Sequence, residues 1–259
     1  MKAKRYVKQI FQKAVLGRLT GIAFLFLGLV ACTNPSPKAP THIRPDAPER
    51  VILSEGELKF EPEIERFDSL LEAGTSNKGG IVFTGSSSIK KWFTLQNDMA
   101  PLPVENRGFG GAIIRQVTYY SNRMIVPLQP KLLVFYCGEN DIANDVYPAE
   151  RTLNDYKNFV ATMRQKLPNT GILFVSMKPS PKRWQWWDKF KAGNAMIKEY
   201  IAQQQDMWYV DIGEAMLGSN GRPRKELFVS DSLHMSPEGY QLWSDILKPE
   251  VIRHYDGLQ

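Results

Sequence analysis

Three kinds of side chain in this sequence could together carry out nucleophilic catalysis. A serine hydroxyl is a weak nucleophile until a base takes its proton, and three serines stand side by side at Ser86–Ser88. Of the three histidines, His42 lies in a proline-rich stretch and His254 at the far end of the last expected helix, which leaves His234 as the base. Asp231, three residues before that histidine in a turn-rich segment, could bond its second ring nitrogen and fix the tautomer. These residue types predict a serine nucleophile with a histidine base and an orienting carboxylate.

Attack by a serine on a carbonyl carbon creates a negatively charged oxygen, which needs hydrogen-bond donors aimed at it. Three donors are available: the backbone N–H of Ser87 at the start of a helix, the flexible backbone at Gly111, and the side-chain amide of Asn140. Each of these residues also has a structural explanation by itself, since serine, glycine and asparagine all favour helix caps and tight turns. For the neighbouring Asp141, helix capping and support of the site are equally good explanations.

The candidate residues are far apart in the sequence, so the fold must bring them together. Short apolar segments, typical of buried strands, alternate with segments of helical periodicity. The expected strands are Ile81–Thr84, Val104–Asn106, Leu132–Tyr136, Ile172–Ser176 and Trp208–Asp211. The expected helices are one that contains Phe60–Leu71, followed by Ile113–Met124, Ala149–Leu167, Lys189–Gln205 and Pro237–His254.

This alternation predicts a three-layer α/β domain of flavodoxin-like type, over about residues 51–259, with a central five-stranded parallel sheet. Sheets of this kind bind ligands at the carboxyl ends of their strands. The serine triplet, Gly111 and Asn140 each follow an expected strand within a few residues. The chemistry is therefore expected at that edge of the sheet.

Four short segments resemble, in their order and in their places, the four blocks of the SGNH hydrolases, also called GDSL-like hydrolases. They are Gly85-Ser86-Ser87-Ser88, Asn106-Arg107-Gly108-Phe109-Gly110-Gly111, Gly138-Glu139-Asn140-Asp141 and Asp231-Ser232-Leu233-His234. The resemblance covers about residues 60–255. It departs from the family at Ser86, where many members have an aspartate, so the support that such an aspartate gives to the loop is in doubt.

The resemblance implies a hydrolase that forms an acyl-enzyme on Ser87 and needs neither a metal nor an organic cofactor. Ser87, rather than a neighbour, is matched because it stands two residues past the glycine that ends the expected strand. The other matched positions are His234 as the base, Asp231 as its orienting acid, and Gly111 and Asn140, which form the oxyanion hole with the backbone N–H of Ser87.

The family resemblance extends to O-acetyl carbohydrate esterases, lipases and thioesterases, so the substrate class stays open. We favour a short acyl group, such as acetyl on a glycan, over the longer acyl chains of a lipase or thioesterase. Trp184, Trp186 and Trp187 follow an expected strand on the side of the site and are candidate sugar-stacking residues, although packing explains them equally well. A second class of hypothesis is a non-catalytic carbohydrate-binding lipoprotein that keeps the same fold.

The charge distribution argues against a nucleic-acid partner. The formal net charge is +6, from 33 basic and 27 acidic residues. Six of the basic residues lie within residues 1–31, which contain no acidic residue, so the rest of the chain has 27 of each sign. The sequence also lacks the cysteine pairs and closely spaced histidines of metal sites, and the glycine-rich motifs of nucleotide-binding loops.

The N-terminal segment resembles the signal peptide of a bacterial lipoprotein. Basic residues end at Arg18, and the uncharged run Leu19–Ala31 has 13 residues, too few to span a membrane, which takes about 20. The run ends in Leu-Val-Ala-Cys, which resembles a lipobox whose cysteine, here Cys32, is acylated. The expected organisation is a signal peptide at 1–31, a proline-rich tether at 32–50 and a hydrolase domain at 51–259.

The two cysteines have different expected roles. Cys32 would carry the lipid, and Thr33 after it favours outer-membrane over inner-membrane sorting, so we expect an exported protein held in the cell envelope by its lipid anchor. Cys137 lies in an apolar run and is expected to be a buried packing residue without a disulfide partner.

The lipidation hypothesis predicts the outcome of a labelling experiment. Labelled palmitate should enter the wild-type protein and should not enter a Cys32→Ser variant, because the thiol that carries the lipid is gone. Cells that express the two proteins are labelled and the protein is recovered for comparison. Equal incorporation into both would show that Cys32 is not the acylated residue.

Overall fold

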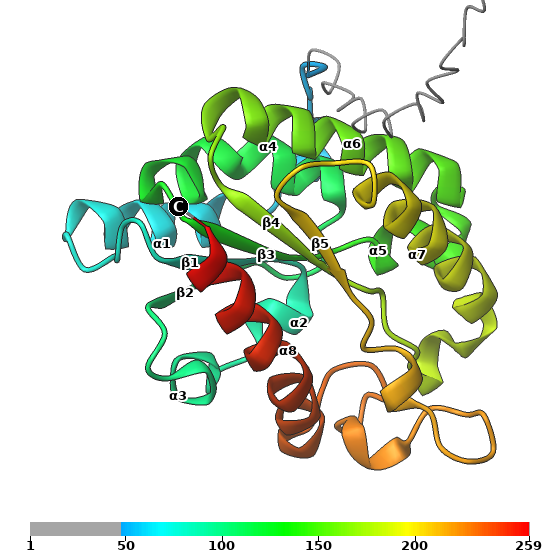
Figure 1. Cartoon of the computed structure of the whole chain (residues 1–259). Helices are drawn as coiled ribbons and strands as arrows, with labels where there is room; N and C mark the ends of the chain where they lie inside the picture. Colours follow the sequence, from blue (N-terminus) through cyan, green and yellow to red (C-terminus); the bar gives the residue numbers. More distant parts are fainter. Residues whose placement is uncertain (1–47, 259) are drawn as a thin grey trace, which may run out of the picture. The chain divides into compact units, whose positions relative to one another are not determined.

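A computed structural model describes residues 48–258 of the chain (Figure 1). The predicted signal peptide, Cys32 and most of the predicted tether lie outside the described residues. The last residues assigned to the tether are described, and they touch the folded domain. The backbone N–H of Glu49 donates to Asn158 Oδ1 at 2.7 Å, and Asn158 Nδ2 donates to the Glu49 carbonyl at 3.1 Å.

The centre of the domain is a five-stranded sheet in which all neighbouring strands are parallel, in the order β2-β1-β3-β4-β5. The strands are β1 (Ile81–Gly85), β2 (Val104–Gly108), β3 (Leu132–Tyr136), β4 (Gly171–Val175) and β5 (Met207–Val210). The register places Gly85 opposite both Gly108 and Tyr136, so the first three strands end in line. The predicted fold class is confirmed, and each strand lies within two residues of its expected bounds.

Helices cover both faces of the sheet, which makes three layers (Figure 1). One face is covered by α1 (Glu61–Glu72), α4 (Ile114–Met124), α6 (Ala149–Lys166) and α7 (Trp187–Ile201). The other face is covered by α2 (Ser87–Lys90), α3 (Leu95–Met99) and α8 (Pro237–Gly257). The short α5 (Glu139–Ile142) follows β3. Short 3₁₀ segments lie at Glu55–Leu58, Val126–Leu128, Ala143–Asp145, Pro181–Trp186, Glu214–Met216 and Lys225–Leu227.

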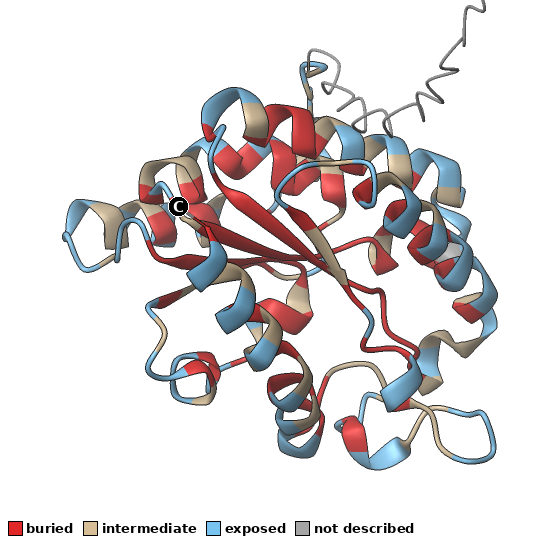
Figure 2. Cartoon of the chain, viewed as in Figure 1, coloured by how far each residue is buried: buried red, intermediate tan, exposed pale blue. Residues whose placement is uncertain are grey.

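Two apolar cores hold the layers together, one on each face of the sheet (Figure 2). Successive strand residues point to opposite faces, so Phe135 of β3 packs against Phe159 of α6, with ring centroids 4.3 Å apart, while Tyr136 packs against Trp243 of α8 at 4.8 Å. All five residues of β1, β3 and β4 are buried, as expected for a sheet covered on both faces. Cys137 is buried in the first core, in line with its expected packing role.

Helix α7 differs most from its expected bounds. It begins at Trp187, two residues before Lys189, because the 3₁₀ turn Pro181–Trp186 runs directly into it. It ends at Ile201, before Gln205, because the chain turns there and reaches Asp206 with a positive φ of 52°, which a helix cannot contain. Within residues 48–258, no helix has both the length and the apolar character that crossing a membrane requires.

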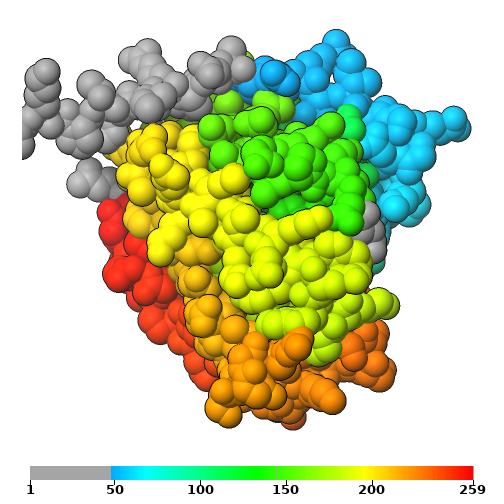
Figure 3. Space-filling view, turned by 90° about the vertical axis from the view of Figure 1, so that its right-hand side faces the viewer, coloured from blue at the N-terminus to red at the C-terminus, as the bar shows by residue number. Residues whose placement is uncertain are grey.

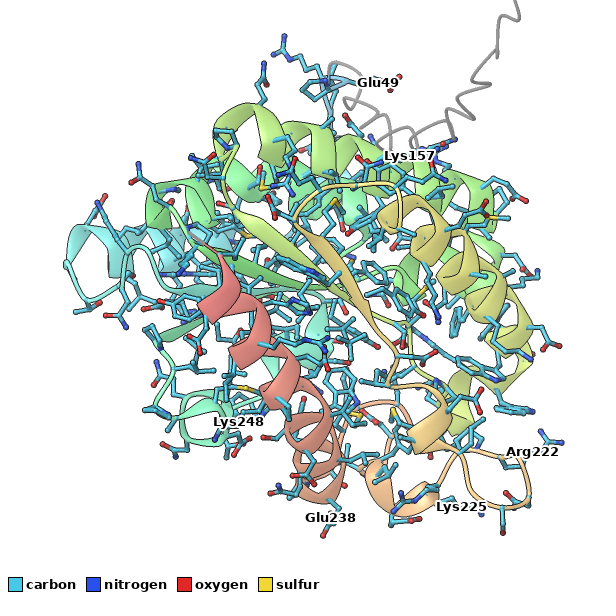
Figure 4. The ribbon with its side chains drawn as sticks, viewed as in Figure 1. Glu49, Lys157, Arg222, Lys225, Glu238 and Lys248 are labelled. Carbon is cyan, nitrogen blue, oxygen red and sulfur yellow. The ribbon has the colours of Figure 1, made fainter. Side chains whose placement is uncertain are left out.

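The two ends of the domain are occupied by different segments. Figure 4 places Glu49 at one end and Arg222 and Lys225 at the other, and Figure 3 shows the same separation from the side. In Figure 3 the orange segment that contains residues 213–236 adjoins the yellow-green segment after β4. The two segments are joined there by a hydrogen bond from the Lys182 N–H to the Ser232 carbonyl at 3.0 Å.

Candidate active site

A sharp turn at the end of β1 exposes one serine of three. Gly85 has a φ of +131°, and a Cβ at this position would lie 1.8 Å from the Tyr136 carbonyl oxygen, so only glycine fits. Ser86 N–H donates to that oxygen at 3.0 Å, and Ser86 is the N-cap of α2. The side chains differ in access: Ser86 and Ser88 are only 4% and 2% exposed, whereas Ser87 is partly exposed. Ser87 is therefore the serine that another group can reach.

Ser87, His234 and Asp231 form one chain of hydrogen-bonded side chains. His234 Nε2 lies 3.0 Å from Ser87 Oγ, and His234 Nδ1 lies 2.5 Å from Asp231 Oδ2. The histidine and aspartate come from the loop before α8, which the Val229 N–H closes by donating to the His234 carbonyl at 2.9 Å. The structure thus brings together the three residues that the sequence selected.

The environment of Asp231 keeps its carboxylate charged. Partial burial opposes ionisation, but the hydrogen bonds from the His234 ring and from the backbone N–H groups of His234 and Leu233 outweigh it and hold the pKa of Asp231 well below its usual range. Both backbone groups donate to Asp231 Oδ1 at 2.9 Å, which leaves Oδ2 for the ring. A fixed carboxylate at Nδ1 leaves the lone pair on Nε2 directed at the serine.

Lys91 lies beside this pair, and the sequence gave no signal for it. Its Nζ is 3.1 Å from His234 Nδ1, and it directly follows α2 at the C-cap. Lysine at a helix C-terminus is usually explained by the helix dipole and by solvent exposure. Lys91 is close to His234 because the loop before α8 folds back over the end of α2, and the sequence of α2 gives no indication of that contact.

The candidate oxyanion-hole residues Gly111 and Asn140 lie on adjacent loops that are bonded to each other. Gly111 has a φ of +74° in the loop between β2 and α4, and Asn140 lies in α5 directly after β3. Asn140 Nδ2 donates to the Ala112 carbonyl at 2.9 Å. The first loop is also held at Gly110, whose N–H donates to Glu63 Oε2 at 3.3 Å. The backbone after Gly111 and the Asn140 amide are therefore fixed relative to each other.

Asp141 is fully buried and caps a helix other than its own. Its Oδ1 accepts a hydrogen bond from the N–H of Ile114, the first residue of α4, at 3.0 Å, and this bond pins the end of the Gly111 loop. Within the described part of the chain its Oδ2 has no hydrogen-bond partner. Burial raises the pKa of Asp141 to about 7, against the opposing effect of the Ile114 N–H. The sequence left two explanations open for Asp141, helix capping and support of the candidate site. The hydrogen bond from the Ile114 N–H fits both, because it caps α4 and also holds the end of the Gly111 loop.

A buried charged cluster next to Asn140 was missed by sequence reasoning. Glu139 accepts hydrogen bonds from Lys178 Nζ at 2.9 and 3.2 Å and from the Arg183 guanidinium at 3.1 Å, and Tyr136 Oη also donates to it. Lys178 and Arg183 follow β4 in the segment Lys-Pro-Ser-Pro-Lys-Arg. The only available signal was Lys178, a lysine three residues after the end of a continuous apolar strand, where a charged side chain is hard to solvate.

The three tryptophans do not share one environment. Trp187 is only 6% exposed and belongs to the core, which favours packing over sugar stacking for that residue. Trp184 and Trp186 are partly buried against the same core. Trp184 lies between the Trp187 ring, at 6.4 Å, and the Arg222 guanidinium, at 4.9 Å. A substrate contact by Trp184 or Trp186 stays a prediction.

Within residues 48–258, no three side chains of histidine, cysteine, aspartate or glutamate gather as they would around a metal ion. The acidic residues near the site are each bonded to a group of the protein. Asp231 bonds the histidine, Asp141 accepts a hydrogen bond from a backbone N–H, and Glu139 is paired with two cations.

These features define a three-layer α/β protein with a Ser-His-Asp hydrogen-bond chain at the carboxyl edge of its sheet. The model of the GDSL-like lipase/acylhydrolase family matches residues 68–242. The chain belongs to this family, as the four sequence motifs predicted. No curated protein matches the chain.

Solved structures share the fold at low sequence identity. A candidate platelet activating factor from Streptococcus pneumonia is 21% identical with a TM-score of 0.67, over 76% of this chain and 94% of its own. A GDSL-like lipase from Bacteroides thetaiotaomicron is 19% identical with a TM-score of 0.61, over 73% and 98%. A family 3 carbohydrate esterase from Clostridium thermocellum is 18% identical with a TM-score of 0.55, over 69% and 98%.

The raised pKa of Asp141 predicts how stability changes with pH. The unfolded carboxyl releases its proton near pH 4 and the folded one near pH 7, so the folded state binds more protons between these values and stability falls as pH rises through that window. Once the pH has passed 7, the free energy of unfolding should have fallen by on the order of 4 kcal/mol at most. Asp141→Asn should abolish this fall, since asparagine keeps an acceptor for Ile114 and does not ionise.

The measurement is the free energy of unfolding by urea at pH 5 and pH 8.5. The matched control is Asp145→Asn, an exposed aspartate whose pKa is lowered by a hydrogen bond from Lys189, so that it is ionised across the whole window. The same difference between the two pH values in the Asp141→Asn variant and in the wild type would show that another group is responsible.

Proposed function

We propose that this protein is a serine esterase that hydrolyses a carboxylic ester through an acyl-enzyme on Ser87. The observation that carries the proposal is the hydrogen-bond chain from Ser87 Oγ through His234 to Asp231. A partly exposed serine bonded to a histidine, which is bonded in turn to a charged carboxylate, is the arrangement that activates a hydroxyl for attack. Membership of the GDSL-like lipase/acylhydrolase family supports the same chemistry.

In the proposed first step, Ser87 Oγ bonds to the ester carbonyl carbon while its proton passes to His234 Nε2. The carbonyl oxygen becomes an oxyanion, which accepts hydrogen bonds from the backbone N–H groups of Ser87 and Gly111 and from the Asn140 amide. Collapse of this intermediate breaks the bond to the alcohol, which takes the proton from His234. Water, deprotonated by the same histidine, then attacks the acyl carbon; the bond from this carbon to Ser87 Oγ breaks, Ser87 takes the proton back from His234, and the acid is released.

For the substrate we propose a short acyl ester on a glycan. Trp184 and Trp186 are partly exposed in the segment after β4, and Lys182 in that segment bonds the loop that carries His234. The Clostridium thermocellum structure with the same fold is a carbohydrate esterase. The alternatives are a lipase or thioesterase for longer acyl chains, and a non-catalytic carbohydrate-binding lipoprotein.

We also propose that the domain is anchored in the cell envelope through Cys32. The support for this proposal is in the sequence, where the uncharged run Leu19–Ala31 ends in Leu-Val-Ala-Cys and so places Cys32 where a lipobox carries its acylated cysteine.

The assignment of the nucleophile predicts a pattern of covalent labelling. A fluorophosphonate probe should label the wild type once, and Ser87→Ala should abolish labelling and lower kcat about 10⁴-fold or more, as loss of the nucleophile does in serine hydrolases. Ser86→Ala and Ser88→Ala are the matched controls, since both hydroxyls are buried, and both variants should keep labelling and turnover. Mass spectrometry of the labelled peptide identifies the modified serine. Retained labelling in Ser87→Ala would refute the assignment, and a folded wild type that takes no label would favour the binding-protein alternative.

The proposed short acyl group predicts a trend across a series of esters. The value of kcat/KM should fall as the p-nitrophenyl ester is lengthened from acetate to octanoate, because a pocket built for a small group excludes the longer chain. A rise with chain length would favour a lipase or thioesterase. Trp184→Ala and Trp186→Ala should weaken hydrolysis of an acetylated oligosaccharide more than that of p-nitrophenyl acetate. Equal effects on both substrates would leave the tryptophans as packing residues.

A further inference from the structure

Arg183 joins the Asn140 amide to the buried cluster behind it. Its Nη2 donates to Asn140 Oδ1 at 2.6 Å, and its Nη1 donates to Glu139 Oε2 at 3.1 Å. The side chain is only 16% exposed, and the residue lies in the 3₁₀ turn Pro181–Trp186 after β4. One guanidinium therefore binds two successive residues of α5 at once, through the two ends of the rigid planar fork that distinguishes arginine from lysine.

The guanidinium has a rigid anchor. Glu139 is buried, and its carboxylate also accepts hydrogen bonds from Lys178 and Tyr136. Lys178 is itself buried. If the Glu139 carboxylate moved out toward solvent, the Lys178 ammonium would be left buried without its partner, which is unfavourable. Because every charge in this cluster has a partner, Arg183 is held in one position relative to α5.

The two contacts of Asn140 select one orientation of its amide. A guanidinium can only donate, so Oδ1 must face Arg183, and the Ala112 carbonyl can only accept, so Nδ2 must face Ala112. A flip of the amide by half a turn would place two donors together at one end and two acceptors together at the other. In the observed orientation one Nδ2 hydrogen is used by Ala112, and the second remains for a further acceptor.

We propose that Arg183 is a positioning residue that holds the Asn140 amide in its donating orientation toward the oxyanion. The inference rests on the proposed esterase function, because it concerns the oxyanion hole of that same site. The cluster also contributes a net positive charge when Glu139, Lys178 and Arg183 are all ionised. A positive charge on the Oδ1 side polarises the amide and strengthens its N–H as a donor.

The test is a double-mutant cycle with p-nitrophenyl acetate, built from Arg183→Ala, Asn140→Ala and the double variant. Loss of one oxyanion-hole donor costs about 10²–10³ in kcat, so Asn140→Ala should fall in that range with little change in KM. Arg183→Ala should lower kcat about 10–10²-fold, also with little change in KM. The double variant should be no slower than Asn140→Ala, because Arg183 acts only through that amide. The matched control is Arg253→Ala, an exposed arginine near the C-terminal end of α8 that pairs with Glu250 and should leave kcat unchanged.

Two further measurements separate positioning from folding. Arg183→Lys should recover part of the lost kcat, because an ammonium can replace one of the two hydrogen bonds. Millimolar methylguanidinium should raise kcat of Arg183→Ala and leave that of the double variant unchanged. If Arg183→Ala does not fold, as judged by circular dichroism and thermal unfolding, the cycle is run with Arg183→Lys in its place.

The outcomes distinguish this inference from the proposed function. If Ser87→Ala abolishes turnover while the effects of Arg183 and Asn140 multiply in the double variant, the esterase function stands and the positioning role is refuted. A change in KM alone for Arg183→Ala also refutes it, since that would indicate a direct contact with substrate. If the wild type has no turnover that depends on Ser87, the proposed esterase function is refuted, and the positioning role of Arg183 is refuted with it.

Discussion

The close contact between Gly85 and the Tyr136 carbonyl is the constraint on which the rest of the site depends. A Cβ at position 85 would stand 1.8 Å from that oxygen, and the φ of +131° is one that other residues rarely adopt. Because the glycine leaves this space open, the Ser86 N–H reaches the carbonyl and the chain turns at once into α2. The same carbonyl ends β3, which leads within four residues to Glu139 and Asn140. One backbone contact thus joins the turn of the proposed nucleophile, Ser87, to the segment that carries the proposed oxyanion-hole amide, Asn140.

Three carboxyl groups around this contact have different tasks because their surroundings differ. Asp231 accepts hydrogen bonds from two backbone N–H groups and from the histidine ring, so its pKa is lowered and its charge is kept. Asp141 is buried, and burial outweighs the hydrogen bond from the Ile114 N–H, so its pKa rises to about 7; the role of this carboxyl is to cap α4. Glu139 stands between two cations and anchors them. The number and charge of the donors, more than burial alone, decide which carboxyl is available for chemistry.

The sheet and the candidate catalytic residues could be predicted because local patterns mark them. Parallel strands covered on both faces are continuous apolar runs, and Ser87 is marked by its distance from Gly85. The role of Arg183 could not be predicted in this way, because an arginine in a polar segment is by default solvated and its partner Glu139 is 44 residues away. Trp187 was indistinguishable from the two tryptophans before it, since its burial is decided by how α7 docks on the sheet. The sequence pattern places these loops at one edge of the sheet, but the tertiary fold decides which side chains pair across them.

The site and the body of the domain are held by different kinds of interaction. The layers are held by two apolar cores, whereas the loops at the carboxyl edge are held by polar bonds from one loop to the next. From the Ala112 carbonyl these bonds run through Asn140 and Arg183 to Glu139 and Lys178, and so cross the loops after β2, β3 and β4. Short loops at a sheet edge have little apolar surface to bury, so hydrogen bonds must supply their order. Asn140 and Arg183 are the partly exposed members of this chain of bonds, so we expect their loss to disturb the proposed oxyanion hole more than the two buried cores.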